Sequence, residues 1–211
     1  MEKIIKKDGE ALKNVRLSAA VIGLFLNFAL FLTKLYIGIS SCSLTIYCDA
    51  VNNLGDTFAC GIAIFGFYMI KKLGETPSQR AQSLCTFVIS LLIAGTGIYF
   101  VYNGIERMMY PLPVQYSLKY LAVISVTVGV KALMGLMFRA FDKKSESPVL
   151  KALALDSLLD CFITLAAVMS LVLVSKINYA VDGLFAIVTG SIISASAIKN
   201  IIRETKYLIN N

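Results

Sequence analysis

The stretch ALALDSLLDCFITLAAVMSLVLVS, residues 152–175, decides the fold class of this chain. It is long enough to cross a lipid bilayer, because about 20 helical residues rising about 1.5 Å each span about 30 Å of hydrocarbon. Similar apolar runs lie near residues 17–37, 44–70, 83–105, 114–138 and 180–202. The runs lack the apolar and polar alternation of barrel strands. We therefore predict an all-α, polytopic membrane protein with six transmembrane helices.

The overall composition supports this class and leaves little room for a second domain. Hydrophobic residues make up 57% of the 211 residues, and the mean hydropathy is +0.75. Residues 1–15 are polar and rich in lysine, without the apolar core and cleavage site of a signal peptide, so we predict a cytoplasmic N-terminal arm. We expect residues 16–208 to form the transmembrane domain, with no C-terminal soluble domain after it.

The distribution of positive charge predicts the orientation in the membrane. Cationic residues follow the second, fourth and sixth apolar runs: Lys71, Lys72, Arg80, Arg139, Lys143, Lys144, Lys199, Arg203 and Lys206. By the positive-inside rule both termini face the cytoplasm, and we expect a bacterial plasma membrane as the host. The net charge of +7 is explained by cations that fix the membrane orientation and contact anionic lipid headgroups. We therefore expect no nucleic acid partner.

Acidic and amide residues inside the apolar runs are the informative feature, because a charge near the bilayer centre is energetically costly. Asn52 and Asp56 lie four residues apart in the second run, and Asp156 and Asp160 lie four residues apart in the fifth. Residues at this spacing share one face of a helix. Two such helices packed face to face can surround one cation, so we predict these four residues as its ligands.

An internal repeat supports the pairing of the two runs. Ser43 precedes Asp56 by thirteen residues, and Ser147 precedes Asp160 by the same distance. Each half holds three spans, so the halves must have opposite orientations. This 3+3 inverted-repeat character is typical of transporters whose binding site lies near the membrane midplane.

Other polar residues leave alternatives open. Lys34 or Lys131 could neutralise one of the acidic residues in a purely structural ion pair. Asp49, one turn before Asn52, could be an accessory metal ligand or part of the access path. Cys60, one turn after Asp56, could add a softer ligand, although a lone cysteine in an apolar helix is usually packing.

The ordered series of motifs resembles the cation diffusion facilitator family, whose members have six helices with paired motifs on the second and fifth. The matching segments are Asn27 to Ser43, Asp49 to Asp56, Arg107 to Pro111, Ser147 to Asp160 and Tyr179 to Gly183, with Asp182 expected as a helix N-cap. Zinc members typically carry histidine beside aspartate in these motifs. Histidine is absent from this chain, and the Asn-Asp plus Asp-Asp set is similar to the manganese-type branch.

The resemblance implies a secondary transporter that exports a divalent metal ion in exchange for protons. Oxygen ligands favour Mn²⁺, with Fe²⁺ or Zn²⁺ as further candidates. Protons and metal compete for buried carboxylates, which provides the coupling. The metal is a substrate, and we expect no permanently bound cofactor and no enzymatic activity.

Two other functions stay open at this point: a non-transporting subunit with a structural metal site, and a cation channel lined by an acidic ring. We expect any homodimer to form through the membrane helices. Small residues such as Gly95 and Gly97 in the third span are candidates for that interface.

Overall fold

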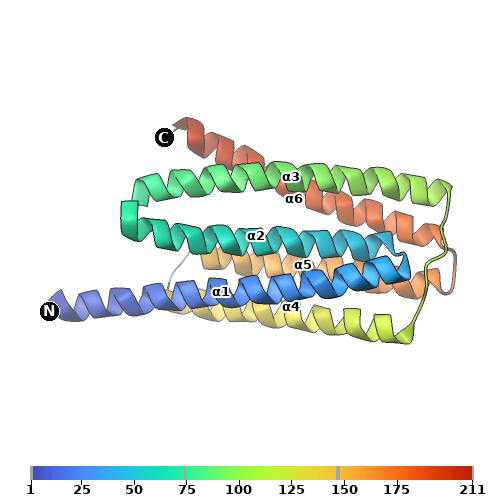
Figure 1. The fold of residues 1–211 in the computed structure, drawn as a ribbon, viewed down its shortest axis with the longest axis horizontal. Helices are drawn as coiled ribbons and strands as arrows, with labels where there is room; N and C mark the ends of the chain where they lie inside the picture. Colours follow the sequence, from blue (N-terminus) through green and yellow to red (C-terminus); the bar gives the residue numbers. More distant parts are fainter. Residues whose placement is uncertain (1, 74, 146–147, 211) are drawn as a thin grey trace.

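The computed structural model describes the backbone of residues 2–73, 75–145 and 148–210, and side chains within residues 15–69, 79–143 and 149–209. The described residues form six helices, which confirms the predicted all-α class (Figure 1). Their bounds are α1 Glu2–Ser41, α2 Leu44–Leu73, α3 Glu75–Met109, α4 Leu118–Ser145, α5 Pro148–Val174 and α6 Ala180–Asn210.

Successive helices run in opposite directions along one long axis (Figure 1). Helices α1, α2, α4 and α5 form a bundle, and α3 packs along α6 beside it. The start of α1, the ends of α2, α4 and α6 and the starts of α3 and α5 lie at one end, which we call the terminal end. The α1–α2, α3–α4 and α5–α6 connections lie at the opposite end, which we call the distal end. Six antiparallel helices place the two ends of the chain on the same side of the bundle, and the prediction that this side faces the cytoplasm stays a prediction.

Two helices begin at residues other than those where the apolar runs begin. Helix α1 begins at Glu2, so most of the predicted N-terminal arm is a continuation of the first helix. Helix α4 begins at Leu118, four residues after the start of the apolar run near residues 114–138. Val114 is buried in the α3–α4 connection, and the amide of Gln115 donates a 2.8 Å hydrogen bond to the carbonyl of Ser41. The apolar residues of the α3–α4 connection are explained by its packing against the distal end of the bundle.

Within the described residues, five helices are long and apolar enough to cross a membrane: Val15–Ser41, Gln79–Met109, Leu118–Lys143, Val149–Val174 and Ala180–Ile209. Helix α2 has 30 residues but carries Asp49, Asn52, Asn53 and Asp56 in its first half. Its length matches that of its neighbours. The outside of the bundle carries many exposed large apolar side chains, and such a surface is suited to contact with lipid.

A tight turn joins α1 to α2 at the distal end. Cys42 adopts a left-handed backbone conformation with φ of 54°, and the amide of Ser43 donates to the carbonyl of Gly38 at 3.1 Å. A Cβ on Gly38 would lie 2.9 Å from the backbone nitrogen of Tyr47. Glycine is therefore needed at residue 38 for α2 to start so close to α1.

Glycines also bring α3 and α6 into backbone contact. A Cβ on Gly104 would lie 2.8 Å from the carbonyl oxygen of Gly183, and a Cβ on Gly97 would lie 2.9 Å from that of Gly190. Small residues commonly allow such close helix approach in membranes. Gly97, suggested above for a dimer interface, is thus occupied by α6 of its own chain, whereas a Cβ on Gly95 would meet nothing within 4 Å.

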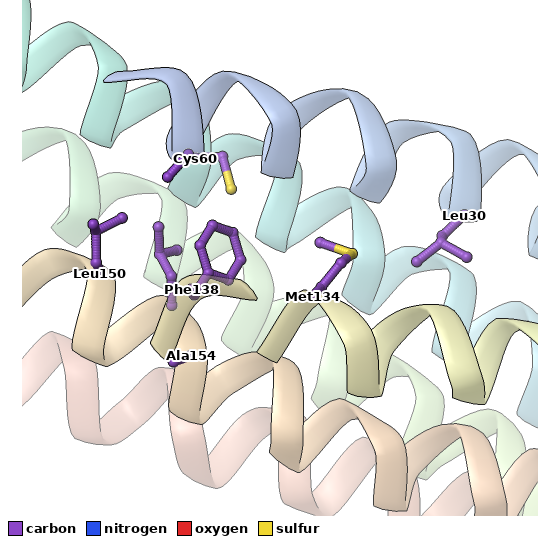
Figure 2. Close-up of a cluster of buried hydrophobic side chains, with 8 residues drawn as sticks. Leu30, Cys60, Met134, Phe138, Leu150 and Ala154 are labelled. Carbon is purple, nitrogen blue, oxygen red and sulfur yellow. The ribbon is translucent and has the colours of Figure 1, made fainter. Parts of the chain in front are cut away.

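The bundle core near the terminal end is apolar. Figure 2 shows Cys60, Met134, Phe138, Leu150 and Ala154 packed together between the helices. Cys60 is fully buried there, and its Sγ accepts a weak hydrogen bond from Nδ2 of Asn27 at 3.7 Å. The structure therefore gives Cys60 a packing role.

Candidate metal centre

Helices α2 and α5 meet through the residues predicted as metal ligands. Asn52 and Asp56 lie on one face of α2, and Asp156 and Asp160 lie on one face of α5. Across the interface, Nδ2 of Asn52 donates a 2.6 Å hydrogen bond to Oδ1 of Asp160. The i, i+4 spacing in each helix therefore places the two motifs opposite one another.

One cavity of about 120 Å³ has all four predicted ligands in its wall. Ser90 of α3 and Asn200 of α6 contribute further polar groups, and isoleucines from α3, α5 and α6 make up much of the rest. Asp156 is the most exposed of the predicted ligands, and Asp160 is buried. The structure thus brings Asn52, Asp56, Asp156 and Asp160 to the wall of one cavity inside the helical bundle.

Lys131 of α4 reaches the same carboxylates from the side of the bundle. Its Nζ lies 2.7 Å from Oδ2 of Asp56 and 2.7 Å from Oδ2 of Asp160. The same ammonium donates a 2.8 Å hydrogen bond to Oδ1 of Asn27 on α1. Lys131 is fully buried, and these contacts use all three of its donors. Sequence analysis named Lys131 only as a charge partner, and the structure makes it the central contact of the site.

No three Asp, Glu, Cys or His side chains converge on one point as a metal site within the described residues. The geometry explains why, because Lys131 lies between Asp56 and Asp160 while Asp156 lies farther along the cavity wall. The nearby donors are carboxylate and amide oxygens. Such a donor set suits a hard divalent cation, provided that the side chains close in on it.

A second, larger cavity of about 420 Å³ adjoins the first, and we call it the vestibule. The two cavities share Gly55, Ala59, Ser90, Ile93, Asp156 and Asn200 in their walls. The vestibule continues past Gln82, Arg203 and Glu204, in the parts of α3 and α6 nearer the terminal end. Asp156 therefore stands where the vestibule meets the inner cavity.

Glu204 is a polar residue of the vestibule that sequence analysis did not single out. Its carboxylate accepts hydrogen bonds from Oγ of Ser83 at 2.7 Å and from Nε of Arg203 at 2.8 Å. Glu204 is only 9% exposed although it lies near the end of α6. The sequence feature that could have indicated Glu204 is its position as an acidic residue among the cations that follow the last span.

Asp49 makes a separate ion pair with Lys34 of α1. Nζ of Lys34 lies 2.9 Å from Oδ1 and from Oδ2 of Asp49, and it also donates to Oγ1 of Thr164 on α5 at 2.8 Å. Lys34 and Asp49 are both fully buried, and Asp49 does not line either cavity. This pair matches the structural alternative considered for the lysines, and an accessory role for Asp49 in metal binding stays a prediction.

The distal end is closed by hydrogen bonds around Asp182. Its Oδ1 accepts from Oγ of Ser43 at 2.7 Å and from Oγ of Ser170 at 3.0 Å, and its Oδ2 accepts from the amide of Leu44 at 2.7 Å. Asp182 was expected to cap α6, but it lies inside the first turn of that helix and caps the start of α2 instead. Ser147, the counterpart of Ser43 in the internal repeat, lies outside the described residues.

Comparison with known protein families agrees with this architecture. A family model described as the cation efflux transmembrane domain matches residues 20–209, which include the residues of both cavities. A comparison with curated proteins finds no significant match. The match spans nearly the whole chain and confirms the resemblance seen in the motifs. This protein belongs to the cation efflux family, also called cation diffusion facilitators, and is a multi-pass membrane transporter of metal cations.

Proposed function

We propose that this protein exports Mn²⁺ from the cytoplasm in exchange for protons, using Asn52, Asp56, Asp156 and Asp160 as ligands. The observation that carries the proposal is the single cavity whose wall contains all four residues. Two of its walls are helices that carry equivalent i, i+4 pairs in opposite halves of the chain. Transporters with inverted repeats bind their substrates at such an interface.

The donor chemistry supports manganese over zinc. Three carboxylates and one amide line the cavity, and the chain has no histidine. Hard oxygen ligands suit Mn²⁺, whereas zinc sites in proteins generally use nitrogen and sulfur. Fe²⁺ is expected to be a weaker substrate, and Zn²⁺ weaker still.

Proton exchange follows from the same carboxylates. Metal binding requires their ionised form. Once the metal leaves, the three carboxylates of the cavity face one buried ammonium, that of Lys131, and the charge that this ammonium does not compensate is removed by proton uptake. Each release of metal to the outside would then be accompanied by proton uptake, which returns the carrier to the cytoplasmic side.

The two ends of the molecule support a cytoplasm-facing state. The vestibule leads from Asp156 towards the terminal end, and the hydrogen bonds of Asp182 hold the distal end together. With both termini in the cytoplasm, as the positive-inside rule predicts, the vestibule is the route by which the metal enters.

Proteoliposomes containing purified protein test the proposal. An imposed pH gradient at zero membrane voltage should drive Mn²⁺ flux, and Asp56→Ala or Asp160→Ala should lower that flux at least about tenfold, because each removes a ligand. Glu106→Gln is the matched control, since Glu106 is an exposed carboxylate outside both cavities. Equal flux in Asp56→Ala, Asp160→Ala and wild type would refute the ligand assignment.

The same preparation distinguishes the other functions. High conductance that ignores the pH gradient would indicate a channel. Tight Mn²⁺ binding without any flux would indicate a structural metal site. Coupled movement of Mn²⁺ and protons, lost in the aspartate variants, is the result that the exchanger predicts.

A further inference from the structure

The Lys131 ammonium occupies the position between Asp56 and Asp160 that a bound cation would take. It lies 2.7 Å from an oxygen of each carboxylate. Hard divalent ions bind oxygen at about 2.0–2.6 Å. A metal ion bound to the same oxygens would lie at most about 5 Å from the ammonium, and two cations so close in a low-dielectric interior repel each other strongly. The metal and the ammonium therefore compete for Asp56 and Asp160.

The ammonium also has a partner that is not one of the predicted ligands. Oδ1 of Asn27 on α1 accepts its third hydrogen bond at 2.8 Å. Asn27 lines neither cavity, so this contact lies outside the inner cavity and the vestibule. When a metal ion arrives through the vestibule, Lys131 can keep its hydrogen bond to Asn27 while it releases the two carboxylates.

We propose that Lys131 is a specificity-determining residue, a tethered competitor that holds the cation position in the metal-free protein and yields it to a divalent ion. The inference rests on the proposed function, because it takes Asp56 and Asp160 as metal ligands. In the metal-free protein the ammonium keeps the two carboxylates close despite their mutual repulsion. It thereby preserves the site between transport cycles.

Discrimination by charge is the functional consequence. Na⁺ and K⁺ carry the same single charge as the ammonium. Replacing the ammonium with either ion therefore does not strengthen the Coulomb attraction between the cation and the two carboxylates. A divalent ion brings a second charge, which compensates for displacing the lysine. Lys131 thus excludes the abundant monovalent cations while admitting scarce divalent ones.

The competition also weakens the apparent affinity for metal. If the ammonium is withdrawn about a tenth of the time, the apparent dissociation constant is about tenfold larger than the intrinsic one. Weaker binding favours release of the metal on the far side of the membrane. A transporter gains from this, whereas a structural metal site would not.

Equilibrium binding of Mn²⁺ to purified full-length protein tests the inference, with Lys131→Met as the main variant. Removal of the competitor should lower the dissociation constant for Mn²⁺ about tenfold. It should also make Mn²⁺ binding sensitive to added Na⁺, to which wild type is expected to be insensitive. A residue that only supports the fold would change neither property in this direction.

Two controls separate the charge from its position. Lys131→Arg keeps a cation beside the carboxylates and should neither tighten Mn²⁺ binding nor introduce Na⁺ sensitivity. The double variant Lys34→Met/Asp49→Leu removes the other buried ion pair, which lines neither cavity, and it should not tighten binding either. Lys131→Gln, which keeps a hydrogen-bond donor without the charge, serves as a second test if Lys131→Met does not fold.

The inference and the proposed function fail in different ways. If wild type binds Mn²⁺ and Asp56→Ala abolishes binding, but folded Lys131→Met or Lys131→Gln binds it no more tightly, the competitor role is wrong while the site stands. If wild type does not bind Mn²⁺, or the aspartate variants bind it normally, the proposed function itself is wrong.

Discussion

Nδ2 of Asn52 donates a 2.6 Å hydrogen bond to Oδ1 of Asp160, so an amide from one half of the chain directly contacts a carboxylate from the other. The contact places residue 52 where its side chain can select the metal. Asn52→His puts an imidazole nitrogen beside Asp160, and nitrogen ligands favour Zn²⁺. We expect the ratio of Zn²⁺ to Mn²⁺ transport in proteoliposomes to rise several-fold. An unchanged ratio would argue that residue 52 is not a ligand.

The glycine contacts between α3 and α6 predict a difference in stability between two alanine variants. A Cβ on Gly104 would lie 2.8 Å from a backbone oxygen of α6, which cannot move aside without shifting the helix. We expect Gly104→Ala to lower the free energy of unfolding by about 1–3 kcal/mol. Gly95→Ala is the matched control on the same helix, because its Cβ would meet nothing within 4 Å. Equal unfolding temperatures for the two variants in detergent would contradict the close packing.

The buried pair of Lys34 and Asp49 predicts a strong asymmetry between single and double substitutions. Lys34→Met leaves the Asp49 carboxylate buried without its ammonium partner and should destabilise the protein by about 3–5 kcal/mol. Lys34→Met/Asp49→Leu removes both charges and should restore most of that loss. Thermal unfolding of the single and double variants measures the difference. A double variant as unstable as Lys34→Met would show that the lysine stabilises the fold through something other than this ion pair.

The hydrogen bonds of Asp182 predict that its carboxylate stabilises the distal end. Asp182→Ala leaves the amide of Leu44 and the hydroxyl of Ser43 without their acceptor in a buried location. Each orphaned donor carries a desolvation penalty, so we expect a loss of about 1–3 kcal/mol in unfolding free energy. Asp182→Asn keeps one side-chain oxygen and should lose less. Hydrogen exchange at the start of α2 should speed up in Asp182→Ala, and unchanged protection there would contradict the capping role.

The sequence predicted the helices and the opposed motifs because both depend on local periodicity. Apolar runs define spans, and i, i+4 spacing defines a face. The partner of each buried lysine depends on helix rotation and packing, which periodicity does not encode. Lys34 is the one cation in the run 17–37, and Lys131 shares the run 114–138 with Lys119. Only the packed bundle pairs Lys34 with Asp49 and Lys131 with Asp56 and Asp160.

The difference between the start of α4 and the start of its apolar run has a similar cause. Val114 is apolar because it packs inside a connection, and a hydropathy run cannot distinguish that from a span. Asp182 was read as a local cap because capping signals are local, yet its acceptors are used by a helix start 138 residues earlier in the chain. Such long-range capping becomes visible only when the ends of several helices are seen together.

The carboxylate of Asp182 fastens three helices at one point, since it accepts hydrogen bonds from the start of α2 and from Ser170 of α5 while belonging to α6. These three helices also carry most of the inner cavity wall. Their distal tips therefore cannot spread apart individually. For the metal ion to leave on that side, one of two motions is required. Either the hydrogen bonds of Asp182 break, or the distal ends of α2, α5 and α6 move together as one rigid body relative to α1, α3 and α4.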